Sequence, residues 1–168
     1  MSSGVRVGLV LLSAAVLQRG VFSQVRLAGV SVDVFLLLAV GAGIAAGPER
    51  GAVIGFISGL TLDLLVATPL GLSALVYCLA AYLTGRFHGT TVRSSRWLTA
   101  GLVAVASAAA VGGYALLAEL LGQEGAVGPR LPVLLVVLPV VNALLTPPVL
   151  RVLRWAVRDE RDLRPAIR

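Results

Sequence analysis

The 168-residue chain contains no lysine, one cysteine and one histidine, and only 13% of its residues are charged. The single cysteine, Cys78, excludes a disulfide framework and a metal site built from several cysteines. The charged fraction is about half of that in globular domains, which leaves too little polar surface to cover a soluble fold of this size. Disordered chains are poor in apolar residues, so the 58% hydrophobic content also excludes disorder.

Patterns typical of catalysis and cofactor binding are missing as well. The single histidine, His88, lies in an arginine-rich segment without a nucleophile motif. The chain has no phosphate-binding loop, dinucleotide fingerprint or HExxH motif. Pumps and coupled transporters need several ionisable groups near the membrane midplane, and the centres of the apolar segments carry almost none. We therefore expect no enzymatic activity, no cofactor and no metal, and a membrane subunit that recruits other proteins or binds a small molecule.

The chain does have long apolar segments. Six of them approach the ~20 residues that a helix needs to cross a bilayer core of ~30 Å. They cover about Val5–Phe22, Val32–Gly47, Gly51–Ala67, Leu70–Gly85, Trp97–Leu121 and Leu131–Leu153. A fusion of two short segments among the second to fourth would leave five spans. We predict an all-α bundle of about six membrane helices that forms a single domain over residues 1–168.

The positions of the fourteen arginines test this topology. With the N-terminus in the cytoplasm, eleven arginines fall on the cytoplasmic side and three, Arg19, Arg26 and Arg130, on the outer side. The net charge is then +7 inside and −1 outside, as the positive-inside rule requires. This asymmetry accounts for the excess of positive charge without nucleic acid as a partner. We therefore expect a multi-pass membrane protein with both termini in the cytoplasm.

A stripe of small residues marks the third span. Gly51, Gly55, Gly59 and Asp63 are spaced by four residues and therefore share one face of a helix. Glycines at this spacing allow a second helix to approach closely. We predict that this stripe is a partner-binding face that receives the helix of another protein. The alternative is that it packs within the chain, against the second or the fourth span.

Polar side chains are expected at one level near the outer surface. An ionisable group there is costly without a partner or water, so we predict that these side chains form a polar network. Asp63 would lie ~6 Å deep, four residues from the outer end of its span. The alternative is that helix ends simply collect polar groups, with Asp33 as a helix N-cap. The predicted network consists of Gln18, Arg19, Asp33, Asp63, Glu119 and Arg130.

The sixth span and the tail carry two further features. Pro139 removes a backbone hydrogen bond and predicts a kink, where Asn142 would bond the freed backbone or a neighbouring helix. A substrate site at a broken helix is the alternative.

The basic tail covers about residues 154–168, and spacing places several arginines on one helical face. We expect this face to contact anionic lipid or a cytoplasmic partner through Arg151, Arg154, Arg158 and Arg161.

One part of the chain resembles a known family. Residues 55–65 read GFISGLTLDLL and residues 68–72 read TPLGL. This pair is similar to the central motif of the bacterial rod shape-determining MreD family. At the start of the second span the family commonly has Pro-Asp. This chain keeps the aspartate, Asp33, but has Val32 in place of the proline. The resemblance covers about residues 5–90, and the rest fits by hydropathy and by its basic tail. Other positions that match the family are Gln18, Asp33, Tyr82 and Gly85.

The resemblance implies a non-enzymatic scaffold of the cell-wall elongation complex in the bacterial plasma membrane. Members of the family associate with MreC and, through it, with actin-like MreB filaments, the glycosyltransferase RodA and a class B penicillin-binding protein. Their fold is likened to the substrate-binding membrane subunits of energy-coupling-factor vitamin transporters. Such a subunit is the alternative function, and it would need a polar, aromatic-lined pocket near the outer side. A pore would need a continuous polar stripe through one span, and the sequence shows none.

Overall fold

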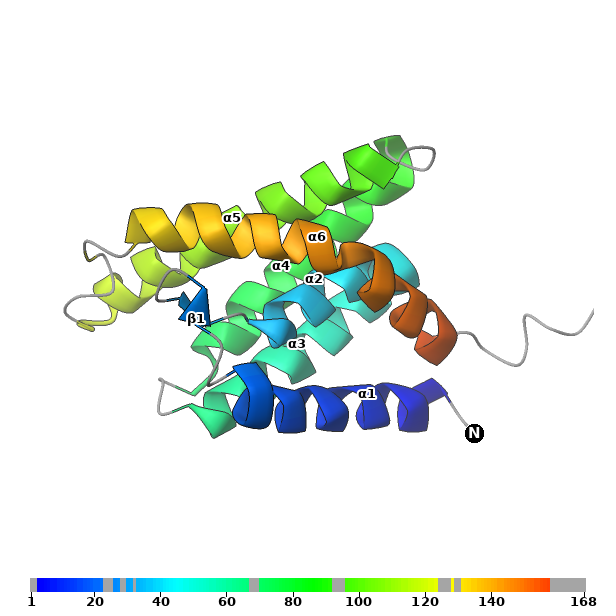
Figure 1. Cartoon of the computed structure of the whole chain (residues 1–168), viewed down its shortest axis with the longest axis horizontal. Helices are drawn as coiled ribbons and strands as arrows, with labels where there is room; N and C mark the ends of the chain where they lie inside the picture. The colour runs from blue at the N-terminus through cyan, green and yellow to red at the C-terminus, as the bar shows by residue number, and fades with distance from the viewer. Residues whose placement is uncertain are drawn as a thin grey trace, which may run out of the picture.

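The computed structural model describes residues 3–22, 26–27, 30–31, 33–66, 70–91, 96–123, 128 and 131–157. This part of the chain is almost entirely helical (Figure 1), which confirms the all-α class. One helix is found where each of the six apolar segments was expected. The π-helical turn η1 (Gln18–Phe22) follows α1, and the short strands β1 (Arg26–Leu27) and β2 (Val30–Ser31) pair antiparallel before α2. The α-helices are α1 (Ser3–Leu17), α2 (Val34–Ala46), α3 (Pro48–Leu65), α4 (Leu72–Thr91), α5 (Arg96–Leu120) and α6 (Leu131–Val157).

Two of the helices can cross a membrane by length and composition. They cover Trp97–Leu120 in α5 and Leu131–Val157 in α6. The apolar helix α2 is shorter, with 13 residues. α4 ends at Thr91 rather than at the expected Gly85, so part of the arginine-rich segment is helical.

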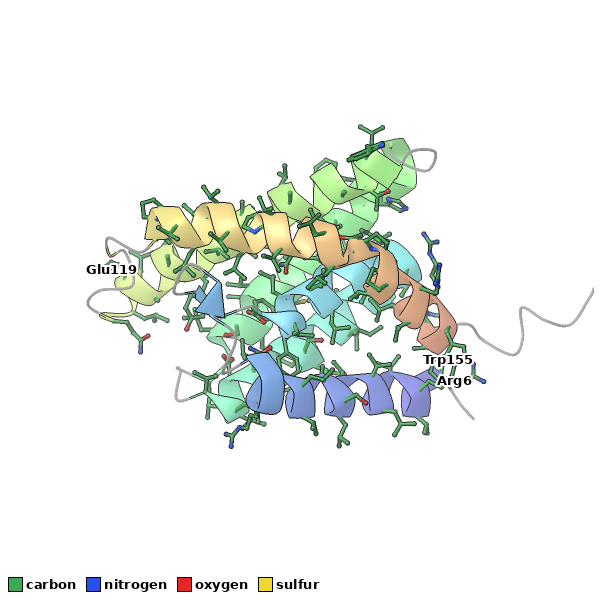
Figure 2. All side chains as sticks on the ribbon, viewed as in Figure 1. Arg6, Glu119 and Trp155 are labelled. Atoms are coloured by element: carbon green, nitrogen blue, oxygen red, sulfur yellow. The ribbon has the colours of Figure 1, made fainter. Side chains whose placement is uncertain are left out.

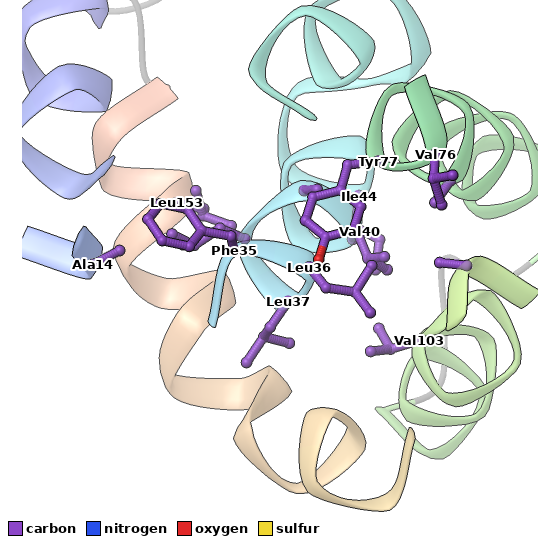
Figure 3. Packing of buried hydrophobic residues seen from close by; sticks show 14 of the residues in the cluster. Ala14, Phe35, Leu36, Leu37, Val40, Ile44, Val76, Tyr77, Val103 and Leu153 are labelled. Atoms are coloured by element: carbon purple, nitrogen blue, oxygen red, sulfur yellow. The ribbon is translucent and has the colours of Figure 1, made fainter. Parts of the chain in front are cut away.

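The short helix α2 lies at the centre of the bundle. Ten consecutive residues, Phe35–Ile44, are buried, and α2 contacts α3, α4, α5 and α6. Every residue of α2 is apolar or glycine, which is typical of a helix that is buried on all sides. Figure 3 shows Phe35, Leu36 and Leu37 pointing in different directions from this helix. The core is therefore built around α2 rather than between two layers.

A single residue connects α2 to α3. Gly47 has φ +83°, in the left-handed region, and its N–H bonds to the carbonyl oxygen of Gly43 at 3.1 Å. Pro48 opens α3, where the missing N–H of proline costs no hydrogen bond. Gly43 and Gly51, four residues to either side of Gly47, then meet closely, because a Cβ on Gly51 would lie 2.5 Å from the Gly43 Cα. The connection thus folds α2 and α3 into a tight helical hairpin.

α6 continues as one helix through Pro139, Pro147 and Pro148. Membrane helices tolerate proline where neighbouring groups satisfy the freed backbone. Figure 1 shows the C-terminal part of α6, in darker orange, approaching the N-terminal part of α1. The kink at Pro139 itself stays a prediction.

The bundle has two ends, which we name after residues labelled in Figure 2. The Glu119 end, on the left, also holds β1, the end of α1 and the start of α6. The Trp155 end, on the right, holds the start of α1 and the end of α6.

Candidate functional site

Polar side chains link helices at the Glu119 end. The Gln18 Oε1 accepts a hydrogen bond from the backbone N–H of Val34 at 3.2 Å, which joins η1 to the start of α2. Asp33 caps α2, because its Oδ1 accepts a hydrogen bond from the Leu36 N–H at 3.0 Å. The Asp33 Oδ2 also accepts a hydrogen bond from the hydroxyl of Tyr77 in α4. Asp33 is thus the N-cap that the sequence left open as an alternative, and it also ties α2 to α4.

Asp63 of α3 caps the N-terminus of α4 in a similar way. Its side chain is 3% exposed, and its Oδ2 accepts hydrogen bonds from the N–H groups of Gly71 at 2.8 Å and Ala74 at 3.4 Å. The N-terminus of a helix has unpaired N–H donors and favours a negative charge, so α3 supplies the cap of α4. Arg19 adds a further link, because its Nη2 donates to the carbonyl oxygen of Leu65, the last residue of α3, at 3.0 Å.

The hydrogen bonds at the Glu119 end involve four of the six members of the predicted polar network. Four of its members link elements of the bundle, through backbone groups and through Tyr77. Glu119 is exposed near the end of α5 at the same end of the bundle (Figure 2). Arg130 lies outside the described residues. A ring of paired side chains therefore stays a prediction, and the four linking members are Gln18, Arg19, Asp33 and Asp63.

Tyr77 takes part in the polar contacts at this end, and the sequence did not predict it. Its side chain is buried, with 4% exposed. A buried tyrosine hydroxyl usually has a hydrogen-bond partner, so a tyrosine inside an apolar segment is the signal that could have revealed it. The partner, Asp33, lies 44 residues earlier in the chain, and the sequence carries no sign of this pairing.

A cavity of about 230 Å³ lies beside the Asp33–Tyr77 link. Residues of α3, α4, α5 and α6 complete its wall together with Asp33 and Leu36. Asp33 is the only carboxylate among the lining residues, and the hydroxyl groups are those of Ser73, Tyr77 and Tyr114. The rest of the lining is apolar, and an apolar wall with a few polar groups is typical of small-molecule sites.

The glycine stripe of α3 is buried within the chain. Gly51 packs on α2, as described above. A Cβ on Gly55 would lie 2.6 Å from the carbonyl oxygen of Tyr77, and a Cβ on Gly59 would lie 2.4 Å from that of Ser73. Real Cβ atoms essentially never approach backbone atoms this closely, so the packing of α3 on α4 requires glycine at these positions.

This packing corrects the prediction of a partner-binding face on Gly51, Gly55, Gly59 and Asp63. α2 and α4 occupy the stripe, and Asp63 caps α4. A partner helix could reach these residues only if α3 first separated from its neighbours. The structure thus uses the stripe for packing within the chain, which is the alternative that the sequence left open.

An apolar groove of about 530 Å³ runs between α1 and α6. α1 contributes Leu9, Ser13 and Leu17, and α6 contributes Val149 and Val152. α2 also reaches the groove, so the core helix forms part of its wall. The groove is therefore a recess on the α1 side of the bundle, lined by the first two α-helices and by the distant α6.

α1 and α6 contact each other at the Trp155 end of this groove. The guanidinium carbon of Arg6 lies 5.6 Å from the centroid of the Trp155 ring, within the range of a cation–π interaction (Figure 2). On the other side of Trp155, a hollow of about 510 Å³ is lined by Arg151, Arg154 and Thr99, among others. Both of these arginines are exposed, whereas Arg158 and Arg161 lie outside the described residues.

Asn142 lies buried between α5 and α6. Its Nδ2 donates a hydrogen bond to the Ser107 Oγ at 2.9 Å, so it bonds a neighbouring helix, one of the two partners that the sequence left open. Its Oδ1 has no hydrogen-bond partner among the described residues. Leu138 and Ala110, which line the cavity near Asp33, lie one helical turn away from Asn142 and Ser107 respectively. The Asn142–Ser107 pair therefore fixes α5 to α6 next to that cavity.

The described residues show bonds between helices and recesses rather than a reaction centre. They contain no group of three or more His, Cys, Asp or Glu side chains that could hold a metal ion. Cys78 is partly buried in α4. The arrangement offers a packing surface on α1 and α6 and a small cavity with one carboxylate.

Comparison with known proteins identifies one family. A family model described as rod shape-determining protein MreD matches residues 4–154, which is nearly the whole chain. The match extends well beyond residues 5–90, the part on which the sequence resemblance rests. No curated protein and no solved structure matches the chain.

Proposed function

The chain belongs to the family of the rod shape-determining protein MreD, and from this we infer that it is a non-enzymatic membrane scaffold of cell-shape determination. The family match over residues 4–154 is the observation that carries this role. A substrate-binding subunit of a vitamin transporter, the alternative from the sequence, has no comparable support. In the proposed role the chain binds the transmembrane helix of MreC. Through MreC it is connected to MreB filaments, RodA and a class B penicillin-binding protein of the elongation complex.

We propose that all six helices cross the bacterial plasma membrane, with both termini in the cytoplasm. The length and apolar composition of α5 and α6 and the asymmetric arginines support this topology. The Glu119 end is then outer and the Trp155 end cytoplasmic. Exposed Arg151 and Arg154 lie where anionic lipid headgroups attract basic side chains by ~1 kcal/mol each.

Cysteine labelling tests this topology. In a Cys78→Ala background, single cysteines replace Gln123 after α5 or Arg151 in α6, both of which are exposed. We expect a membrane-impermeant maleimide to label the cysteine at 123 in intact cells and the cysteine at 151 only after permeabilisation. The reverse pattern would show that the orientation is inverted, and labelling of both in intact cells would show that the span count is wrong.

We propose that the groove between α1 and α6 receives the MreC helix. Lipid tails are as apolar as helix surfaces, so membrane helices associate through close packing, which small residues permit. Small side chains are present in the groove at Ser13 and Ala14, between the larger Leu9 and Leu17. Leu9 and Leu17 are 48% and 46% exposed in the chain alone, so a docked helix would cover apolar surface along the α1 side of the groove.

The Arg6–Trp155 contact lies at one end of the proposed docking groove. This contact joins α1 to α6 at the proposed cytoplasmic end of the groove. In the proposed topology, a single-span partner lying along the groove emerges on the outer side at the Glu119 end. That is where the extracytoplasmic domain of MreC, as known in the family, would begin.

Bulky substitutions in the groove test this proposal. Ser13→Trp and Val152→Trp would each fill it, because both positions line the groove and both are exposed. We expect MreC that is co-expressed with either variant to be lost on purification. Val16→Trp is the matched control, because Val16 is 66% exposed on α1 and does not line the groove. We expect this variant to retain MreC.

The fold of each variant is checked by its thermal unfolding temperature in detergent. If both groove variants unfold like the wild type and still retain MreC, the groove is not the binding site. If MreC does not co-purify even with the wild-type chain, the scaffold function itself is contradicted.

A further inference from the structure

The cavity beside Asp33 is separate from the α1–α6 groove, and the proposed scaffold function does not use it. We propose that this cavity binds an alkylammonium group, a primary amine cation with a short apolar chain. The charge, the aromatic rings and the size of the cavity all favour such a ligand. It requires no partner protein and can be tested on the chain alone.

The charge of the cavity favours a cation. Asp33 is the only carboxylate among the lining residues, which include no arginine and no histidine. The described bonds of its two oxygens come from neutral donors, the N–H groups of Leu36 and Phe35 and the hydroxyl of Tyr77. An ionised carboxylate can accept about four hydrogen bonds, so it can also accept one from an ammonium group. An anion placed here would be repelled by the same carboxylate.

Two aromatic rings strengthen this preference. Tyr77 and Tyr114, from α4 and α5, both line the cavity with Asp33. A cation near the face of an aromatic ring is attracted by its quadrupole, and proteins recognise ammonium ligands in this way with aromatic side chains. Ser73 adds a hydroxyl that can accept a further N–H bond.

The apolar wall and the volume of the cavity determine what can be attached to the ammonium group. Side chains such as Leu62, Val111 and Leu134 require an apolar body next to the ammonium group. The volume of about 230 Å³ is below the ~300–1,000 Å³ of sites for drug-sized ligands, so only a short chain fits inside. In the proposed topology the cavity lies toward the outer leaflet, where the headgroup of phosphatidylethanolamine carries a primary ammonium group. A free amine has the same chemistry.

Ligand-induced stabilisation of the purified full chain tests the proposal. The probes are hexylamine at pH 7, where it is cationic, and hexanol, its uncharged counterpart. We expect hexylamine to raise the unfolding temperature of the wild type in a neutral detergent, and hexanol to leave it unchanged. Asp33→Asn keeps an oxygen for the Leu36 N–H but removes the charge, so we expect affinity for hexylamine to fall by about tenfold or more.

Two further variants separate binding from folding. Glu119→Gln removes a carboxylate at the same end of the bundle that does not line the cavity, and we expect it to bind like the wild type. Ala110→Leu places a larger apolar side chain into the cavity wall, where Ala110 is 4% exposed. We expect this variant to fold and to lose the response to hexylamine. The proposal is overturned if the wild type shows no shift, if hexanol acts equally, or if Asp33→Asn and Ala110→Leu respond like the wild type.

Native mass spectrometry identifies the source of the ammonium group. The chain is supplied with phosphatidylethanolamine or with phosphatidylglycerol, which lacks an amine. Selective retention of phosphatidylethanolamine that disappears in Asp33→Asn supports the cavity as a lipid site. Equal retention of both lipids by the wild type and by Asp33→Asn, together with hexylamine binding that depends on Asp33, supports it as a site for a free amine.

Discussion

Gly59 of α3 lies directly against the backbone of Ser73 in α4, so that a Cβ on Gly59 would fall 2.4 Å from the Ser73 carbonyl oxygen. We expect Gly59→Ala to push the two helices apart and to destabilise the chain by ~1–3 kcal/mol, as overpacking of a core does. The measurement is thermal unfolding in detergent, followed by circular dichroism. Gly101→Ala in α5 is the control, because no described atom beyond the neighbouring residues and backbone of its own helix lies within 4 Å of its Cβ position. Equal unfolding temperatures for the two variants would contradict this packing.

The second prediction concerns the cap of α4. Asp63→Ala removes the acceptor of the Gly71 and Ala74 N–H groups, and we expect a loss of ~0.5–2 kcal/mol, as for other helix caps. Asp63→Asn keeps one side-chain oxygen and should therefore lose less. Unfolding temperatures of the two variants and the wild type give the order. If both variants unfold at the wild-type temperature, the cap does not contribute to stability.

The third prediction concerns the bond between α5 and α6. Asn142→Ala, Ser107→Ala and the double variant form a thermodynamic cycle for the Asn142–Ser107 hydrogen bond. We expect a coupling energy of ~0.6 kcal/mol, the average found for hydrogen bonds between membrane helices. Chemical unfolding of the four proteins in mixed micelles provides the values. Strictly additive effects would mean that the bond contributes nothing.

The fourth prediction concerns the end of the groove where Arg6 lies over the Trp155 ring. Trp155→Leu removes the ring that faces Arg6, whereas Trp155→Phe keeps an aromatic face. We expect the leucine variant to lose ~0.5–1 kcal/mol of cation–π attraction and the phenylalanine variant to lose less. Unfolding measurements in an Arg6→Gln background provide the control, since the difference between the two variants should shrink when the cation is absent.

The positions of the helices could be predicted from the sequence because each depends on a local run of apolar residues. Turn residues and charges separate these runs, and the observed helices follow them closely. Gly47 and Pro48 show why the α2–α3 boundary was clear, since both favour a break at this point. The extension of α4 to Thr91 was missed because charged residues after Gly85 suggested a loop, although they are compatible with a helix that leaves the apolar layer.

The contacts of the site were harder to predict, because spacing along one helix does not identify what packs against it. The Gly55 and Gly59 pattern predicted close packing correctly, but only the fold shows that α4 is the neighbour. The Asp33–Tyr77 bond joins residues 44 positions apart, and no local pattern encodes such a pair. The α1–α6 groove combines the first and last helices of the bundle, so it could be found only in three dimensions.

The burial of α2 has a consequence for the order in which the protein is made. α6 packs on α2, and a Cβ on Gly41 would lie 2.7 Å from the Cδ1 of Leu153. Of the described helices, α2 is synthesised second and α6 last. In the proposed topology, part of the α2 surface would therefore face lipid until α6 is made. The centre of the bundle can reach its packed state only when α6 arrives. Assembly of the core around α2 would therefore be completed only by α6, and a chain shortened before α6 would leave the α6-facing surface of α2 uncovered.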